Sequence, residues 1–364
     1  METIPELIKS LIRFKSTHDR PDEICRCADF IEDYLKFENI PYKRIDRNRI
    51  PSIMVLPEPH YARVLLVSHF DVVGGPDRLF HPQEKKGCIY GRGSIDDKYA
   101  VALSLVLLKN HLTAARQRRG GLPDLSFGVL ITGDEEVGGH DGVDPLLSRV
   151  RADFGIVLDG GALEQIVVKE KGILRLKLTA KGRSAHSARP WLGENAIDNL
   201  LEDYAHIRSR FSETAPDHWH PTLNISRVAA GVSDNQVPDR AEAVFDIRYT
   251  ENEDPDRLVR VLSKSISGEL TVSYRAPVYD GGASPYLDLL KKMLPSVTFG
   301  FEHGASDARH LSKRKIPSIV WGADGNGSQH SEDEHVVIES VFELYDRLES
   351  FLKKVPEVSR NNKG

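Results

Sequence analysis

The chain has 364 residues, of which 40% are hydrophobic and 28% are charged, and its formal net charge is -5. This length allows about two domains with a substantial core. A mild acidic excess without long basic runs argues against nucleic acid or a membrane surface as the main partner, and no stretch approaches the roughly 20 apolar residues that span a bilayer. The three cysteines have no disulfide or zinc-finger spacing, which favours a reducing, cytoplasmic location.

Short apolar runs bounded by polar residues predict buried strands. These runs lie at 63–69, 126–132, 154–158 and 316–321. Segments with helical patterns lie before, between and after them, at 3–16, 22–37, 99–112, 142–149, 287–293 and 338–353. Strands that alternate with helices predict an α/β fold with a mostly parallel sheet that is covered on both faces.

The pattern changes after Lys169. Residues 172–181 alternate apolar and polar side chains, as a half-exposed antiparallel strand does. The next segments predict helix, strand, strand, helix and strand, in that order, at 195–211, 222–230, 241–250, 254–266 and 269–275. The order β-α-β-β-α-β is the ferredoxin-like plan. We therefore predict a catalytic domain formed by 1–167 and 279–364, with an inserted domain at 168–278.

Histidines and carboxylates follow the predicted strands where those strands end. His69 and Asp71 follow the first strand, 134–136 follow the second and Asp159 follows the third, while His330 lies in a later Gly-rich turn. Open α/β sheets bind their ligands beyond the carboxyl ends of the strands, so these side chains are candidates for one site. Two histidines with several carboxylates suit zinc, manganese or cobalt better than calcium or magnesium.

Each of these residues also has a simpler interpretation. Asp96 and Asp97 precede a long apolar helix and could cap it. The carboxylates at 134–136 could form an exposed acidic loop, and His69 and His330 could be surface residues of turns. Several separate strand ends that each deliver a histidine or a carboxylate favour a metal site over these alternatives.

The chain also resembles a known family, the co-catalytic zinc exopeptidases and deacylases. The motifs that carry the resemblance are SHFDVV at 68–73, GRGSIDDK at 91–98, TGDEEVGG at 132–139, VLDGG at 157–161, GRSAHSARPWLGENAI at 182–197, NQVPDRAEAVFDIR at 235–248, HGASDAR at 303–309 and HSEDE at 330–334. This family includes succinyl-diaminopimelate desuccinylase, acetylornithine deacetylase, aminoacylase and glutamate carboxypeptidase. Its fold, a zinc-binding α/β domain with an inserted ferredoxin-like lid, agrees with the pattern of predicted elements.

The resemblance implies a site for two divalent metal ions, with zinc expected and cobalt or manganese as alternatives. Asp96 would bridge the two ions. His69 and Asp159 would complete the first site, and Glu136 and His330 the second. These five residues are therefore the predicted metal ligands.

The resemblance implies further roles around the metals. Glu135 would be the general base that takes a proton from water and later delivers it to the leaving amine. Asp71 would orient His69. A cis peptide bond is expected between Asp96 and Asp97.

On the inserted domain, the resemblance implies residues that bind the substrate. His186 would stabilise the oxyanion, often in the active site of a partner subunit, so a homodimer through the inserted domain is expected. Asn235 and Arg248 would bind the substrate carboxylate, because a guanidinium offers a fork of donors. The backbone at Gly304 would add donors to the same carboxylate.

Together these features predict a binuclear metal-dependent amidohydrolase that cleaves an amide next to a free carboxylate. An N-acyl amino acid is the expected substrate, with deacylation like that of succinyl-diaminopimelate desuccinylase or acetylornithine deacetylase. The alternative is a carboxypeptidase or dipeptidase that acts on short peptides with the same machinery. A non-catalytic binding protein of the same fold would have lost part of the ligand set, whereas all five ligands and Glu135 are present.

Overall fold

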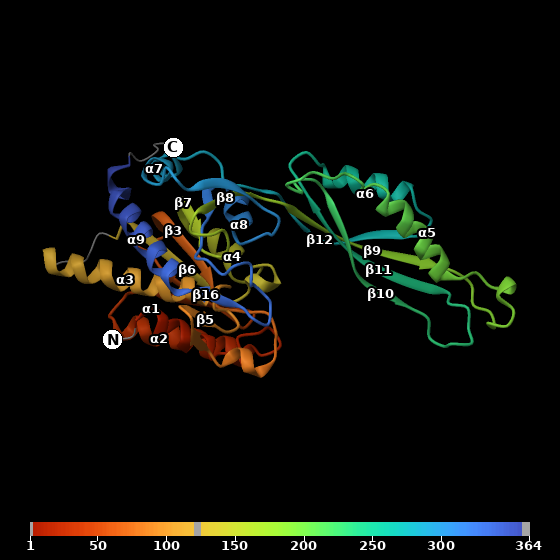
Figure 1. The fold of residues 1–364 in the computed structure, drawn as a ribbon, viewed down its shortest axis with the longest axis horizontal. Coiled ribbons are helices and arrows are strands. Elements are labelled where there is room, and N and C mark those ends of the chain that lie inside the picture. The colour runs from red at the N-terminus through yellow and green to blue at the C-terminus, as the bar shows by residue number, and fades with distance from the viewer. Residues whose placement is uncertain (1–2, 120–124, 359–364) are drawn as a thin grey trace. The chain divides into compact units, whose positions relative to one another are not determined.

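The computed structural model describes residues 3–119 and 125–358, which form two compact units (Figure 1). The larger unit consists of the chain up to Lys169, of Asp280–Phe301 and of the chain from Ser306 onwards. The smaller unit consists of Glu170–Tyr279 and Glu302–Ala305. The predicted boundaries at 168–278 lie close to this division but place 302–305 in the other unit.

The larger unit is built on a mixed, mostly parallel sheet. Its strands are β1 (Lys43–Arg47), β2 (Ile50–Val55), β3 (Tyr61–His69), β6 (Phe127–Thr132), β7 (Arg151–Val157), β8 (Gln165–Glu170), β13 (Tyr279–Asp280), β14 (Thr298–Glu302) and β15 (Ser318–Val320). They follow the order β1-β2-β6-β3-β7-β15-β8-β13, with β14 paired to β8. The central pairs β6-β3, β3-β7 and β7-β15 are parallel, as the alternation of strands and helices predicts.

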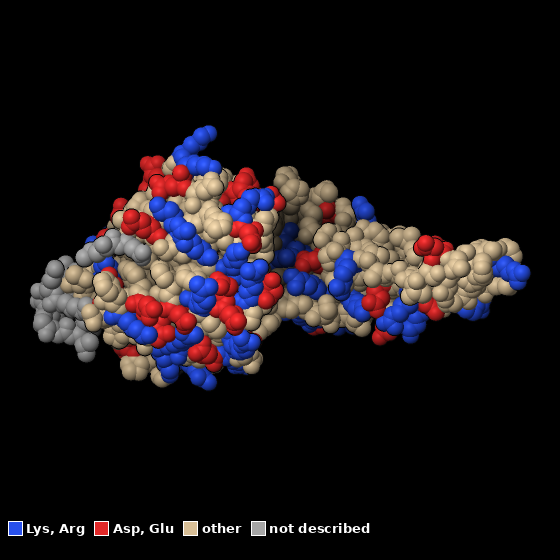
Figure 2. All heavy atoms as spheres, turned by 90° about the horizontal axis from the view of Figure 1, so that it is seen from below, with Lys and Arg blue, Asp and Glu red and all other residues tan. Residues whose placement is uncertain are grey.

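Helices cover this sheet and complete the core. They are α1 (Ile4–Ile12), α2 (Pro21–Phe37), α3 (Lys98–Arg119), α4 (Val143–Leu147), α7 (Pro285–Met293), α8 (Ala308–Lys313) and α9 (Ile338–Lys354). The apolar run of α3 is buried almost throughout, because helices and the sheet surround it. Within the described ranges, no helix is both long and apolar enough to cross a membrane. On the face that Figure 2 shows, acidic and basic side chains of the larger unit are interspersed.

A small antiparallel sheet lies beside the segment that leads into α3. It contains β4 (Gln83–Lys85), β5 (Cys88–Tyr90) and β16 (His335–Val337) in the order β16-β5-β4. The Gly91 amide donates to the Glu334 carbonyl oxygen at 2.9 Å, which continues the contact beyond the strands. This pairing brings the loop at 328–334 next to the turn at 91–96.

The smaller unit has the predicted ferredoxin-like order of elements. They are β9 (Gly172–Lys181), α5 (Ala196–Arg208), β10 (Thr222–Ala230), β11 (Arg240–Tyr249), α6 (Pro255–Lys264) and β12 (Glu269–Ala276). The strands form an antiparallel sheet in the order β10-β11-β9-β12. Apolar residues of β9 and β11 pack against α5 and α6 to form a separate core.

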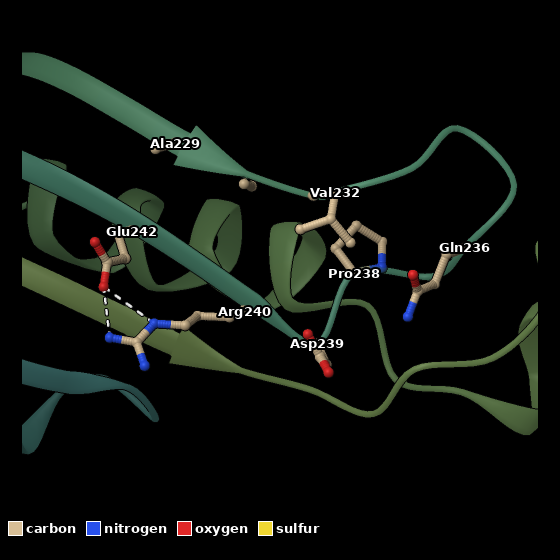
Figure 3. Close-up of a pocket in the computed structure, with 9 residues that line it drawn as sticks. Ala229, Val232, Gln236, Pro238, Asp239, Arg240 and Glu242 are labelled. Atoms are coloured by element: carbon tan, nitrogen blue, oxygen red, sulfur yellow. Dashed lines mark hydrogen bonds and ion pairs between the residues drawn. The ribbon is translucent and has the colours of Figure 1, made fainter.

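The β10 strand is an edge of this sheet and its second half is exposed. Val228 is 56% exposed, and Val232, just beyond the strand, is 90% exposed. A pocket of about 300 Å³ lies at this end of the sheet (Figure 3). Its lining includes Val232, Pro238, Arg240 and Glu242, and Arg240 donates two hydrogen bonds to Glu242.

Candidate metal centre

Three of the predicted ligands follow neighbouring parallel strands. His69 is the last residue of β3, Glu136 lies in a 3-10 turn after β6, and Asp159 lies just beyond the end of β7. The strands β6, β3 and β7 are adjacent in the sheet and run in the same direction. Their carboxyl ends therefore meet at one edge, where an open α/β sheet places its ligand site.

Asp96 lies between two histidines. Its Oδ1 atom is 3.1 Å from His69 Nε2, and its Oδ2 atom is 2.9 Å from His330 Nε2. Asp159 Oδ2 lies 3.7 Å from His69 Nε2, and Glu136 Oε1 lies 3.2 Å from His330 Nε2. The five predicted ligands thus form two groups that share Asp96, and within each group the ligand atoms lie within 4.8 Å of one another.

The orientation of His69 fits a metal ligand. Its Nδ1 atom donates to the Asp71 carbonyl oxygen at 3.0 Å, which leaves Nε2 facing Asp96. Nε2 is buried and makes no hydrogen bond within the described chain. A histidine that is fixed through one nitrogen and presents the other to carboxylates is typical of a metal site. The donor set of imidazole nitrogens and carboxylate oxygens fits zinc and similar divalent ions.

The carboxylates and histidines of the two ligand groups create a site that favours bound positive charge. Burial alone would raise the pKa of Asp96, but its close contacts with the His330 and His69 rings lower the pKa below the usual range. Hydrogen bonds to Asp96 and Glu136 raise the pKa of His330 to about 10. Burial raises the pKa of Glu136. Cations would replace the protons that these groups otherwise hold.

Glu135 lies next to the ligands but belongs to neither group. Its side chain is 12% exposed, and Arg309 Nη1 lies 3.4 Å from its Oε1 atom. Burial raises the pKa of Glu135 well above its usual range, the charges of Asp307 and Asp159 raise it further, and Arg309 lowers it. A carboxylate with a raised pKa beside a metal site suits a general base.

Asp134, the first of the three consecutive carboxylates, supports the turn instead. Its Oδ2 atom accepts hydrogen bonds from the Asp141 amide at 2.7 Å and the Gly142 amide at 3.0 Å. A Cβ atom on Gly142 would lie 2.1 Å from Asp134 Oδ1, so the close approach requires glycine. The acidic run is therefore neither an exposed loop nor a set of three ligands.

Several supporting residues were not predicted from the sequence as part of the site. Asp97, joined to Asp96 by the expected cis peptide bond, is buried, and its Oδ2 atom accepts from the His69 amide at 3.3 Å. Arg92 forms a buried ion pair with Glu334 and donates to the His330 carbonyl oxygen at 3.1 Å. These residues lie in the same motifs as the ligands, so the motifs alone do not show which residues bind metal and which support the ligands.

The structure places His186 and Asn235 at one end of the smaller unit. The Ser187 amide donates to the Asn235 carbonyl oxygen at 2.9 Å, and His186 forms a β-bridge with Gln236. His186 is exposed, and its Nδ1 atom accepts from the Ala188 amide at 3.1 Å. Both predicted residues therefore lie beyond the Arg240 end of β11.

Arg248 lies at the opposite end of the same strand. It pairs with Thr222 on one side and with Ile173 on the other. The β11 strand has 10 residues, so its ends are roughly 30 Å apart at about 3.3 Å per residue. Within one smaller unit, Arg248 and the pair His186–Asn235 therefore cannot contact the same small ligand.

Gly304 belongs to the Arg248 end of the smaller unit. The ring of its neighbour His303 lies 6.2 Å from the ring of Trp219. Trp219 belongs to the segment that leads into β10 at Thr222, which is the register partner of Arg248. The structure thus brings Gly304 and Arg248 to one end of this unit.

A sheet whose strand ends carry two histidine–carboxylate groups is the arrangement of a metal-dependent hydrolase. The chain belongs to the Peptidase family M20/M25/M40, whose sequence model matches residues 65–354. The resemblance that the motifs indicate is thereby confirmed, and the protein is a hydrolase of the metallopeptidase class.

Individual relatives agree with the family. A probable carboxypeptidase of Arthroderma gypseum is 27% identical over 296 residues, which cover 73% of this chain and 62% of that protein. A succinyl-diaminopimelate desuccinylase of Paracoccus denitrificans is 29% identical over 320 residues, which cover 80% of this chain and 82% of the relative. The crystal structure of an M20 family metallo-carboxypeptidase from Sulfolobus solfataricus has a TM-score of 0.77 at 18% identity, covers 98% of this chain and 100% of its own, and shows the same fold.

Proposed function

We propose that this protein uses two metal ions to hydrolyse the amide bond of an N-acyl amino acid next to a free carboxylate. The observation that carries the proposal is Asp96, whose two oxygens face His69 and His330. Asp159 and Glu136 complete the two groups of ligands, and zinc is the proposed ion. The relative named succinyl-diaminopimelate desuccinylase supports a substrate of this kind.

The chain's own residues supply the proton transfers. Glu135 precedes the ligand Glu136 in the chain and interacts electrostatically with Asp159 and His69, and its raised pKa suits a base that accepts a proton from the attacking water. The same carboxyl group would then pass that proton to the leaving amine nitrogen. Arg309, 3.4 Å from Glu135 Oε1, holds one oxygen of the base. Divalent ions bound at the ligands would polarise the scissile carbonyl and make the water more acidic.

A carboxypeptidase or dipeptidase reaction on short peptides is the second candidate. The relative named probable carboxypeptidase favours it. Both reactions require a carboxylate close to the scissile amide and the same base, so the metal centre does not distinguish them. The acyl or peptidyl group that the enzyme prefers distinguishes them directly.

The test is hydrolysis by the zinc- or cobalt-loaded protein across a small panel of substrates. The panel contains N-succinyl-diaminopimelate, N-acetylornithine, several N-acetyl amino acids and a few dipeptides. We expect a clear preference within it, and we expect Glu135→Ala to lower kcat by at least about 100-fold, because general acid–base catalysis contributes at least that much. Metal content should be unchanged, since Glu135 belongs to neither ligand group.

Glu84→Ala is the matched control, because Glu84 is an exposed glutamate of the same unit on β4. It should keep the wild-type rate. Turnover that persists undiminished in Glu135→Ala would place the catalytic base elsewhere. Wild-type protein that binds two ions but hydrolyses no member of the panel would contradict the proposed reaction.

We also propose that the protein works as a homodimer through the smaller unit. His186 and Asn235 lie at the opposite end of β11 from Arg248, so all three can serve one substrate only if two protomers contribute. The exposed β10 edge near Val228 and Val232 supports an interface there, because an unpaired edge with apolar side chains favours association.

A further inference from the structure

Asp71 connects three segments of the metal centre. Its carboxylate is fully buried, and its Oδ1 atom accepts from the Glu135 amide at 3.1 Å and lies 3.3 Å from His69 Nδ1. Its Oδ2 atom accepts from the Glu136 amide at 3.0 Å. The position of this carboxylate therefore decides where a ligand histidine, a ligand glutamate and the proposed base lie.

The fourth contact of this carboxylate comes from a distant part of the chain. His18 Nε2 lies 3.0 Å from Asp71 Oδ2. His18 belongs to the loop between α1 and α2, and the side chain is 26% exposed. No predicted role and no motif of the sequence included this histidine.

The loop that carries His18 is fastened to the same strand end. Ser16 Oγ donates to the Phe70 carbonyl oxygen at 2.6 Å, and the Val72 amide donates to the Ser16 carbonyl oxygen at 3.0 Å. Ser16 is buried. The backbone at 16–18 is thus held alongside 70–72, which fixes the point from which the imidazole reaches Asp71.

The hydrogen bond has a defined direction. Both carboxylate oxygens of Asp71 accept from backbone amides, those of Glu135 and Glu136, so the carboxylate is also the acceptor in its contact with His18. His18 Nε2 must therefore carry the proton. Without this donor, Oδ2 would keep only the Glu136 amide, and a buried carboxylate with fewer donors reorients or draws in water.

We propose that His18 is a positioning residue of the metal centre, which acts through Asp71 on His69 and on the Glu135–Glu136 backbone. The inference rests on the proposed function, because it assumes that His69 and Glu136 hold metal. Partners of this kind change metal affinity or activity by about 10–100-fold when they are removed. The N-terminal loop thus becomes part of the site although it contributes no ligand.

The experiment compares His18→Leu with His18→Gln. Glutamine offers an amide donor close to the position of Nε2, whereas leucine fills space without a donor. Zinc affinity is measured on the whole protein by competition with a chromophoric chelator, and kcat and KM are measured on the best substrate of the panel. His81→Leu is the control, because His81 is an exposed histidine of the same unit.

We expect His18→Leu to weaken zinc binding at least about 10-fold and to lower kcat with little change in KM. His18→Gln should recover most of both losses, and circular dichroism should show both variants folded. Equal losses in the two variants would show that the hydrogen-bond donor does not account for the effect, and wild-type values in His18→Leu would also overturn the inference. Failure of the proposed function is a different result, in which the wild-type protein itself binds no zinc or hydrolyses nothing.

Discussion

Arg248 and Arg175 share one carboxylate on the sheet of the smaller unit. Arg248 Nε donates to Asp246 Oδ1 at 2.7 Å, and Arg175 Nε donates to Asp246 Oδ2 at 3.1 Å. The first bond uses one edge of the Arg248 guanidinium and leaves its terminal nitrogens to bind another acceptor. This geometry suits the proposed recognition of a substrate carboxylate by Arg248.

We expect Arg248→Ala to raise KM for a carboxylate substrate by at least about 10-fold, because a charge-assisted hydrogen bond contributes about 1.5–3 kcal/mol. Steady-state kinetics on the substrate and on its amide derivative measure the effect, and the amide should lose little. Arg175→Ala removes the other contact of Asp246 and is the matched control. Equal effects of the two substitutions would show that Arg248 only supports the sheet.

At the residue scale, motif resemblance predicted the ligands that meet and the role of Asp71 beside His69, but it did not predict the other residues that support the ligands. The two ligand groups contain the five residues that were predicted, because each lies in a distinctive motif at a strand end. Their roles as metal ligands remain proposals, which the metal content and zinc affinity of the wild-type protein test. His18 could not be predicted, since its contact with Asp71 joins positions that no local pattern relates.

At the scale of elements, Glu32 joins α2 to the chain around β1. Its carboxylate accepts hydrogen bonds from Tyr42 and, at 3.0 Å, from Arg44 Nη1, and Lys36 Nζ lies 3.2 Å away. The hydrogen bond from Tyr42 is the largest cause that lowers the pKa of Glu32, which falls to about 2. The side chain is 20% exposed, so solvent weakens the interaction only in part.

We expect Glu32→Gln to lower the free energy of unfolding by about 1–2 kcal/mol at pH 7. Because the folded pKa lies below the unfolded value of 4.5, this stabilisation is complete above that pH and disappears as the pH falls towards about 2. Urea denaturation at pH 7 and at pH 3 measures the difference. Asp33→Asn, a change at an exposed carboxylate of the same helix, is the control. A difference of the same size at both pH values would contradict the assignment.

The central elements could be predicted because their patterns are strong. Apolar runs predicted the buried strands β3, β6 and β7. The alternation of apolar and polar residues predicted β9 with its bounds at 172–181. The antiparallel additions were missed. For example, β2 contains Pro51, and a proline argues against a central strand, so the composition of this segment does not distinguish it from a loop.

At the scale of the whole molecule, we expect a dimer that depends on the β10 edge. One chain has a mass of 40.7 kDa, and light scattering should give twice this value. Val228→Lys should favour the monomer, because a lysine on an edge strand opposes pairing. Val261→Lys changes a valine on α6 that is 37% exposed and is the control. A wild-type monomer with full activity at the same dilution would overturn the shared use of His186.

The place where the smaller unit interrupts the larger sheet bears on how such a protein arises. The chain leaves that sheet after β8 and returns in β13, and these two strands are neighbours in it. Joining adjacent strand ends takes only a short connection, so an ancestor could have carried a simple turn there. All five proposed ligands lie outside 170–279. The single inserted segment 170–279 thus carries His186, Asn235 and Arg248, and it leaves the segments that hold the proposed metal ligands uninterrupted.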